Sequence, residues 1–376
     1  MKAIYLVIPA IALSILYGCG GSSGAVGGTT SVVPSSVQPT QGGAYALSVF
    51  AEAPGTLRPD DLLQLGNTVF VVYQDNNDNP DGTIAAGVAS AQSQVIEYNL
   101  QGSVLQTFDV PGHPDGLVAY NGTTVWVSSN EDANPLIITI DTSTNTTKIL
   151  KSDVATLPHG GGLDDMKLIG GVVYASGSNP TLTTTPVPNL VPYSTDASGS
   201  TAFNGVSTEP AIYAISPNAD GITFHATPVL TSSTPATLLP GNTAVTLNMT
   251  DPDSSAIDPN GDLATVSQQD SEIVFIHNLD TTSPSVSVLP LTLYGNPWPV
   301  DDVRWSPASG SSFMLLSDNK QQLVYRIDAT ATSGFTPNTA YGAGQGTLLT
   351  IDTIKGTMTP VYIGMNTPHG LIFVTP

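Results

Sequence analysis

Six positions along the sequence carry side chains that can bind a cation or move a proton, and each stands at the start of an apolar run. Aligned as a column, they are Asp60, Asp115, Asp164, Asp253, Asp301 and His369. Three of them are followed at once by a second acid: Asp61, Asp165 and Asp302. Two more histidines come shortly before the column: His113 and His159. Three of the five histidines thus share one phase of a repeat.

A ring of such groups could hold a cation at one end of the fold. Carboxylates alone favour Ca²⁺ or Mg²⁺, whereas His113, His159 and His369 together would admit Zn²⁺ or another transition metal. The metal could then polarise a carbonyl group or activate water. The alternative is structural, because a short Asp side chain accepts hydrogen bonds from its own loop and fixes a turn. Both interpretations remain open at this point.

The elements that would position this column are short β-strands. Helical periodicity is nearly absent after residue 44, and apolar runs alternate with turns rich in Gly, Asn, Asp and Pro. The clearest copy runs from His113 through a turn at Asn121-Gly122, a pair typical of tight hairpins, and ends at Leu150. We expect four strands in this copy, joined as an antiparallel meander.

The column repeats at intervals of 55, 49, 89, 48 and 68 residues. Four-stranded repeats with periods near 40–50 are typical of a β-propeller. We therefore predict an all-β fold in which residues 44–376 form one propeller domain, and the two long intervals predict insertions near 180–208 and 329–346.

The last copy has room for only two strands. The apolar run Ala44–Phe50 could supply a missing one, so that strands from both chain ends close the ring and remove an exposed sheet edge. This count gives six blades of four antiparallel strands. Seven blades remain the alternative, because Thr243–Met249 is an additional strand-like run.

The entry phrases Pro114-Asp115-Gly116-Leu117 and Pro368-His369-Gly370-Leu371, with the strand spacing, resemble the NHL-repeat, gluconolactonase-like and YVTN-type propellers. The resemblance covers residues 44–376 and implies the fold more than a function. Gluconolactonases hold a divalent ion at the channel mouth, and amidating lyases of the NHL type use three channel histidines. The gluconolactonase pattern also needs a Glu near the first entry, and Glu52 lies several residues upstream of the column, which counts against that activity.

Two further features are candidate binding sites. The loop Asp75–Gly82 alternates oxygen-bearing residues as a calcium loop does, with Asn77, Asn79 and Asp81 as ligands, but Val88 stands where an EF-hand has its Glu. A solvated turn rich in Asn and Asp is the alternative. Trp298, in Asn296-Pro297-Trp298-Pro299, could stack on a sugar or peptide.

Other chemistry has no support in the motifs. The sequence contains no Cys-x-x-Cys-His, no Gly-x-Ser-x-Gly and no Gly-rich phosphate loop, so covalent haem, serine esterase and nucleotide chemistry are not predicted. The chain has 30 acidic and 9 basic residues, a net charge of −21, which disfavours nucleic acid and anionic membranes. Cations, cationic ligands and neutral glycans are the expected partners.

The first residues have the layout of a secretory signal. Lys2 precedes an uncharged, mostly apolar stretch of 14 residues, Ala3–Leu16, which is shorter than a membrane span of about 20 residues. Leu16-Tyr17-Gly18-Cys19 then resembles the bacterial lipobox, which implies cleavage after residue 18 and lipid on Cys19, the only cysteine. Gly20, rather than Asp, after the Cys implies the outer membrane over the inner one.

Residues 19–43 carry no charge and predict a flexible tether. Together these features predict a lipid-anchored protein of the cell envelope, facing the periplasm or the outside. We expect its propeller to bind a small molecule, glycan or protein. The alternative is a metal-dependent hydrolase or lyase that uses the Asp and His ring.

Overall fold

The computed structural model describes residues 32–41, 43–184, 188–191, 205–281, 283–309, 312–332 and 334–376. The predicted signal peptide, Cys19 and most of the predicted tether lie outside these residues, as does much of the insertion near 180–208. The described strands belong to one compact unit, Val32–Pro376. The described residues contain no helix with the length and hydropathy needed to span a membrane.

The described residues form β-strands and no α-helix. Most strands fall into six antiparallel groups of four, which we name blades 1 to 6. The strands of each blade are given in order from the innermost to the outermost. Blade 1 contains β3 (Arg58–Leu65), β4 (Thr68–Gln74), β5 (Ser93–Asn99) and β6 (Val104–Val110). Blade 2 contains β7 (Pro114–Asn121), β8 (Thr124–Ser129), β9 (Leu136–Asp141) and β10 (Thr146–Ser152). Blade 3 contains β11 (Met166–Ile169), β12 (Val172–Ser176), β13 (Pro210–Pro217) and β14 (Thr223–Thr231).

The remaining blades complete the circle. Blade 4 contains β17 (Pro252–Ile257), β18 (Leu263–Ser267), β19 (Glu272–His277) and β20 (Ser285–Pro290). Blade 5 contains β23 (Asp302–Trp305), β26 (Ala340–Gly344), β27 (Thr347–Ile351) and β28 (Met358–Ile363). Blade 6 contains β29 (Pro368–Val374), β24 (Phe313–Asp318), β25 (Leu323–Ala329) and β2 (Tyr45–Glu52).

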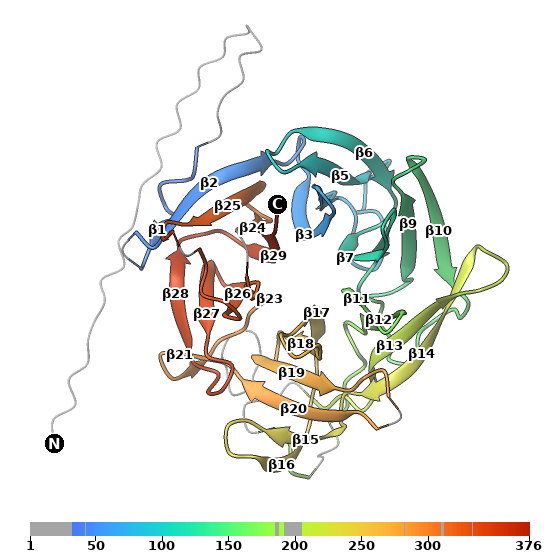
Figure 1. Ribbon diagram of the computed structural model, residues 1–376. Helices are drawn as coiled ribbons and strands as arrows, with labels where there is room; N and C mark the ends of the chain where they lie inside the picture. The colour runs from blue at the N-terminus through green and yellow to red at the C-terminus, as the bar shows by residue number, and fades with distance from the viewer. Residues whose placement is uncertain are drawn as a thin grey trace, which may run out of the picture. The chain divides into compact units, whose positions relative to one another are not determined.

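The inner strands of the six groups meet around a common axis. β3 contacts β7, β7 contacts β11, and the contacts continue through β17, β23 and β29 back to β3 (Figure 1). This closed ring of radiating antiparallel sheets is a β-propeller, so the predicted fold class is confirmed.

Blade 6 joins the two ends of the described chain. β2, near the start, is its outer strand, and β29, at the end, is its inner strand. The predicted closure by strands from both ends is therefore correct. The run Phe313–Leu316 follows the fifth entry phrase in the sequence and would be expected to pair with the strand that begins there. Instead β24 lies beside β29 in blade 6, and β26 takes the place next to β23 in blade 5. The predicted insertion near 329–346 consequently contains a blade strand.

Short extra strands lie at the outer edges. β1 (Gln38–Pro39) pairs with β28, so strand pairing begins inside the predicted tether. The run expected to start a seventh blade instead forms β16 (Thr243–Thr246), which pairs with β15 (Pro235–Leu238) against the outer edge of blade 4. β21 (Thr292–Leu293) and β22 (Asn296–Pro297) form a small hairpin before blade 5.

The core consists of hydrophobic clusters between neighbouring blades. Successive side chains of a strand point to opposite faces of its sheet. In β4, Val69 and Val71 accordingly pack toward blade 6, while Phe70 and Val72 pack toward blade 2. A sheet buried on both faces needs apolar residues at every position, which explains the uninterrupted apolar runs of the second strands.

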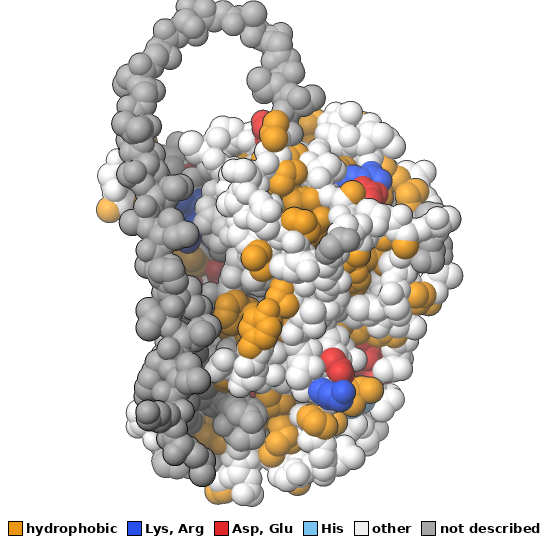
Figure 2. Space-filling model, turned by 90° about the vertical axis from the view of Figure 1, so that its left-hand side faces the viewer, with side chains coloured by type: hydrophobic (Ala, Val, Ile, Leu, Met, Phe, Trp, Pro, Cys, Tyr) orange, Lys and Arg blue, Asp and Glu red, His pale blue; other side chains and the backbone are white. Residues whose placement is uncertain are grey.

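The face of the molecule drawn in Figure 2 carries few charged side chains among many uncharged ones. This agrees with a chain in which charged residues make up 10% of the sequence. A group of the described acidic residues instead lines a cavity at one end of the central channel.

Candidate functional site

A cavity of about 320 Å³ opens at the mouth of the channel, where the inner strands begin. Among the described residues, nine acids and two histidines line it. The acids are Asp60, Asp61, Asp115, Glu131, Asp164, Asp165, Asp251, Asp253 and Asp301, and the histidines are His113 and His369. The structure therefore brings the whole predicted column together, since each member precedes or begins an inner strand and all six inner strands start on this face. We call the column the mouth ring.

Amide side chains at the ends of the second strands hold part of the mouth ring. Gln74 Nε2 donates to a carboxylate oxygen of Asp60 and, at 2.9 Å, to Asp115 Oδ1. Gln268 Nε2 donates to Asp301 Oδ1 at 2.7 Å. Asn319 Nδ2 donates to Gln74 Oε1 at 3.2 Å. These bonds orient the carboxylates without neutralising them.

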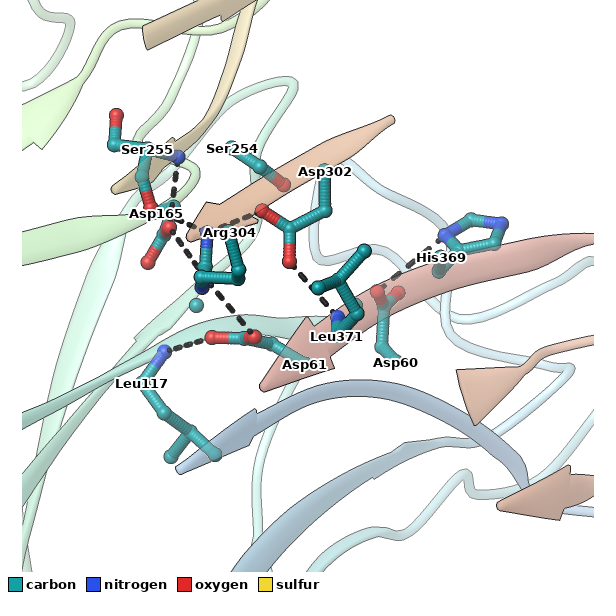
Figure 3. A network of polar contacts seen from close by, with 12 residues as sticks. Asp60, Asp61, Leu117, Asp165, Ser254, Ser255, Asp302, Arg304, His369 and Leu371 are labelled. Carbon is teal, nitrogen blue, oxygen red and sulfur yellow. Dashed lines mark hydrogen bonds and ion pairs between the residues drawn. The ribbon is translucent and has the colours of Figure 1, made fainter. Parts of the chain in front are cut away.

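His369 is the positive member of the mouth ring. Its Nδ1 lies 3.4 Å from Asp60 Oδ1 and 3.5 Å from Asp301 Oδ2 (the Asp60 contact is drawn in Figure 3). Burial alone would lower the pKa of His369, but Asp301 and Asp60 outweigh it and raise that pKa to about 10. The imidazolium is thus charged at neutral pH and makes no metal ligand in this state.

His113, Asp115 and Glu131 form a different group at the same mouth. One ligand atom from each lies within 4.8 Å of the other two. His113 Nδ1 and Asp115 Oδ2 are 3.6 Å apart, and both are buried with no hydrogen-bond partner among the described residues. Burial lowers the pKa of His113, which keeps its imidazole neutral and able to coordinate. Unsatisfied buried polar atoms are costly, and a bound cation is one way to satisfy them.

The acids around this group repel one another. Burial, followed by Asp60 and Asp132, raises the pKa of Glu131 to about 8. Burial, followed by Asp270 and Asp301, raises the pKa of Asp251 to about 7. Burial and Glu131 hold the pKa of Asp115 well above its ordinary value. In the absence of a cation the cavity therefore favours protonated carboxyls.

The acids that directly follow three members of the column have different hydrogen-bond partners. Asp61, Asp165 and Asp302, on blades 1, 3 and 5, form what we call the inner ring. Each accepts a backbone N–H from the inner strand of the next blade: Leu117 N to Asp61 Oδ2 at 2.9 Å, Ser255 N to Asp165 Oδ2 at 2.8 Å, and Leu371 N to Asp302 Oδ2 at 2.8 Å (Figure 3).

Arg304 lies among these three carboxylates (Figure 3). It donates to Asp302 and lies 3.6 Å from oxygens of both Asp61 and Asp165, and Lys167 Nζ adds a 2.6 Å bond to Asp165. The inner ring is therefore a structural clasp in which Arg304 and Lys167 partly balance three carboxylates. Burial, followed by Asp165, raises the pKa of Asp61 to about 6. Accepting backbone hydrogen bonds was the structural alternative considered for the Asp column. In the structure, the residues one position further along the chain perform that role.

The glycines of the entry phrases make room for this clasp. A Cβ atom at Gly116 would lie 2.4 Å from the Asp165 Cα, and one at Gly370 would lie 2.8 Å from the Asp61 Cα. Blades 2 and 6 thus place Gly where their odd-numbered neighbours place the second acid, because the two positions abut across the blade boundary.

His159 is not part of the cavity lining among the described residues. It is fully buried, with Nδ1 2.6 Å from the Tyr213 hydroxyl and Nε2 2.8 Å from the Gly162 carbonyl oxygen. Burial lowers its pKa to about 4. Both ring nitrogens are occupied, so the expectation that His159 joins the channel-mouth ligands is wrong.

The side chains of the predicted calcium loop form hydrogen bonds within the loop, through the amide nitrogens of Asn77 and Asn79 and the carboxylate of Asp81. Asp81 Oδ1 accepts the Thr83 N–H at 2.9 Å, Asn79 Nδ2 donates to Thr83 Oγ1 at 2.9 Å, and Asn77 donates to Asp75. This geometry favours the alternative of a solvated Asx-rich turn. Trp298 packs half-buried against the core between blades 4 and 5 and does not line the cavity, so it offers no open stacking face there.

Sequence reasoning missed Glu131, Asp251 and the amide residues. A usable signal existed for the amides, because Gln74, Asn130, Gln268 and Asn319 all follow or end the second strand of a blade. Glu131 comes directly after that position in blade 2. Glu52, considered as the gluconolactonase-type acid, lies instead on the outer strand β2.

No protein-family model matches the chain, and no curated protein matches it. Among solved structures, the chain is similar to a proposed gluconolactonase, with 10% identity, a TM-score of 0.46, and 91% of this chain and 88% of that chain covered. It is also similar to virginiamycin B lyase from Staphylococcus aureus (12% identity, TM-score 0.43, 88% and 96% covered) and to a protein from Lactobacillus plantarum (10%, 0.44, 84% and 88%). Similarity this distant transfers no activity, and the fold assignment stands on the strand pairing itself.

Proposed function

We propose that this protein is a cell-envelope binding module whose propeller holds a divalent cation at the channel mouth and presents it to a ligand. His113, Asp115 and Glu131 would hold the cation. The charged His369, fixed between Asp60 and Asp301, would form the facing wall of the cavity.

The observation that carries this proposal is the pair of unpartnered buried atoms, His113 Nδ1 and Asp115 Oδ2, beside Glu131. An acidic cluster alone would not suffice, because carboxylates often gather without an ion. Here the imidazole is neutral, the carboxylate is buried, and both point at one space, which is the arrangement that metal ligands need.

The donor set limits the choice of ion. One imidazole with two carboxylates suits Zn²⁺ or Mn²⁺, and the many nearby oxygens also admit Ca²⁺. The predicted trio of histidines does not assemble, since His159 is elsewhere and His369 is ion-paired. We therefore expect first-row transition ions to bind more tightly than Mg²⁺.

The test is calorimetric titration of tag-free, chelator-treated protein with Zn²⁺, Mn²⁺, Ca²⁺ and Mg²⁺. We expect one equivalent to bind, and Glu131→Gln and Asp115→Asn each to weaken binding at least about tenfold. Asp109→Asn, an exposed acid on β6, makes the same charge change and should leave binding unaltered. No saturable binding of any of the four ions, or equal binding by the Glu131 and Asp109 variants, would contradict the proposal.

A second candidate is metal-dependent hydrolysis or lyase chemistry at the same mouth. It is favoured by the 320 Å³ cavity beside the trio and by Asp251, whose raised pKa of about 7 suits a general acid or base. A bound divalent ion would polarise a substrate carbonyl there. Turnover of a lactone that requires both the ion and Asp251 would favour this candidate, whereas ion binding without turnover would favour the binding module.

Lipid attachment at Cys19 completes the proposal and is supported only by the leader sequence. Mass spectrometry of the mature protein should find an acylated N-terminal Cys19, and Cys19→Ala should release the protein from membranes. Unchanged membrane retention of the variant would contradict the anchor. Separation of inner and outer membranes would then test the expected outer-membrane location.

A further inference from the structure

A second polar constellation lies on blade 4, apart from the mouth. His277 Nδ1 is 2.6 Å from Asp262 Oδ2, and His277 Nε2 is 2.9 Å from Ser287 Oγ. Asp262 comes just before β18, and the register places Leu263 opposite Ile276 and Phe275 opposite Ser287. Asp262, His277 and Ser287 are therefore aligned across three adjacent strands on one face of the sheet.

The hydrogen bonds give each group a defined role. An ionised Asp262 carboxylate only accepts, so His277 Nδ1 must carry a proton. In the neutral imidazole Nε2 is then the acceptor, and the Ser287 hydroxyl donates to it. This is the order of contacts by which an acid orients a histidine and the histidine activates a serine, an arrangement recognised by geometry and roles rather than by sequence position.

The serine and histidine face a pocket between blades 4 and 5. The pocket measures about 230 Å³ and is lined by Ser287, His277 and the apolar side chains of Leu239, Phe275 and Trp305. Asn338, Thr353 and Asn260 line its polar side. A side-chain amide such as that of Asn338 can donate to a developing oxyanion, as in other acyl-transfer sites.

We propose that Asp262, His277 and Ser287 form an acyl-transfer site that hydrolyses small carboxylic esters. Ser287 Oγ attacks the carbonyl carbon and loses its proton to His277 Nε2. The carbon–oxygen bond to the alcohol then breaks, and the alcohol leaves with the proton from His277. Water attacks the Ser287 acyl ester, again through His277, and releases the carboxylic acid while Ser287 regains its proton.

The pocket limits the substrate class. Its volume suits a short acyl or small aromatic group packed on Phe275 and Trp305. Asp258 lines the pocket and the chain has a net charge of −21, so esters of neutral or cationic alcohols are favoured over anionic ones. The absent Gly-x-Ser-x-Gly motif does not bear on this site, because Ser287 lies within a strand and not on a strand-to-helix turn.

The experiment follows hydrolysis of p-nitrophenyl acetate and butyrate by the full chain with excess chelator present, so that metal chemistry at the mouth cannot contribute. Ser287→Ala and His277→Gln should each lower kcat/KM by at least about 100-fold. Phenylmethylsulfonyl fluoride should modify Ser287, as peptide mass spectrometry would show. Labelling of the unaltered protein keeps the test valid even if a variant does not fold.

Ser285→Ala is the matched control, because Ser285 lies on the same face of β20 and pairs with His277 in the register. It should keep kcat/KM within about twofold of the parent and keep the label on Ser287. Three outcomes would overturn the proposal: no chelator-resistant turnover, an unmodified Ser287, or equal rates for the Ser287 and Ser285 variants.

Discussion

The mouth ring and the inner ring lie one residue apart along the same strands. Each inner-ring carboxylate accepts a backbone N–H from the next blade, whereas Asp60, Asp115 and Asp301 of the mouth ring are held by amide side chains. In the mouth ring, Asp115 Oδ2 has no hydrogen-bond partner among the described residues, and burial, followed by Glu131, holds the pKa of Asp115 well above its ordinary value. In the inner ring, Asp302 accepts a backbone N–H from the next blade and pairs with Arg304. The comparison teaches that the same side chain serves structure where donors meet it and is available for ligands where they do not.

The alternation of blades explains how the two rings coexist. Second acids occur on blades 1, 3 and 5, and their partners on blades 2, 4 and 6 are Gly116, Ser254 and Gly370 at the matching positions. At Gly116 and Gly370 the absence of a Cβ atom leaves room for Asp165 and Asp61 of the next blade. The inner ring therefore links each odd-numbered blade to the next, while Asp61 and Asp165 line the cavity together with the mouth ring.

The largest effect on stability should come from replacing Arg304, whose guanidinium lies among the three carboxylates of the inner ring. Arg304→Met would leave Asp61, Asp165 and Asp302 buried without their shared positive partner. We expect a loss of at least about 3 kcal/mol in the free energy of unfolding, measured by urea denaturation. Arg304→Lys, which keeps the charge, should lose less. A Met variant as stable as the parent would remove the basis for calling this ring structural.

Adjacent residues offer a sharper comparison. Asp165→Asn disturbs the bonds to Ser255 N and Lys167 and should cost about 2 kcal/mol. Asp164→Asn, in the mouth ring, relieves repulsion with Asp253 and Asp115 and should be neutral or stabilising. Denaturation of the two variants side by side checks this. Equal losses would mean that the rings do not differ.

His159 and His113 differ in the same way, because we expect the first to stabilise the fold and the second to bind the ion. His159→Ala removes a buried group that bonds Tyr213 and Gly162, and we expect a cost of about 2 kcal/mol with ion binding intact. His113→Ala should do the reverse, with little loss of stability and weaker ion binding. Calorimetry and thermal unfolding of both variants test this exchange, and weaker ion binding by the His159 variant would contradict it.

The smallest expected effect concerns how the free energy of unfolding depends on pH. Burial and neighbouring acids raise the pKa of Asp251 to about 7 from an ordinary 3.8. The fold thus favours its protonated form, so the stability it contributes is full below pH 4 and is lost as pH rises through 7. The ion-free protein should become less stable between pH 5 and 8, and Asp251→Asn should flatten that slope. A parent slope of the opposite sign in urea titrations would contradict the repulsion.

Much of the fold could be predicted because strand patterns are local. Asn121-Gly122 and the alternating apolar runs define hairpins. The column of acids and His369 located all six inner strands, five of them by an Asp and the sixth by His369. The pairing of β24 with β29 could not be predicted, because both candidate partners of β24 read as apolar strands and only the closure of the ring selects between them.

The site was predicted in part for a similar reason. The repeat phase located the mouth ring, but Glu131 comes from the connection after a second strand, and the equivalent acid of blade 1, Asp75, is not among the described residues that line the cavity. His159 looked equivalent to His113 because both precede the column, yet His159 turns into the core where Tyr213 supplies a partner. Ser287, His277 and Asp262 come from three strands, and only the register brings them together.

The most direct test of the cation site is diffraction from crystals soaked in Mn²⁺, with anomalous differences measured at a wavelength where manganese scatters. We predict one strong peak bounded by His113 Nδ1, Asp115 Oδ2 and Glu131, absent from crystals of the Glu131→Gln variant. No peak there, or a peak that persists in the variant, would contradict the central claim that the channel mouth is built to hold a divalent ion.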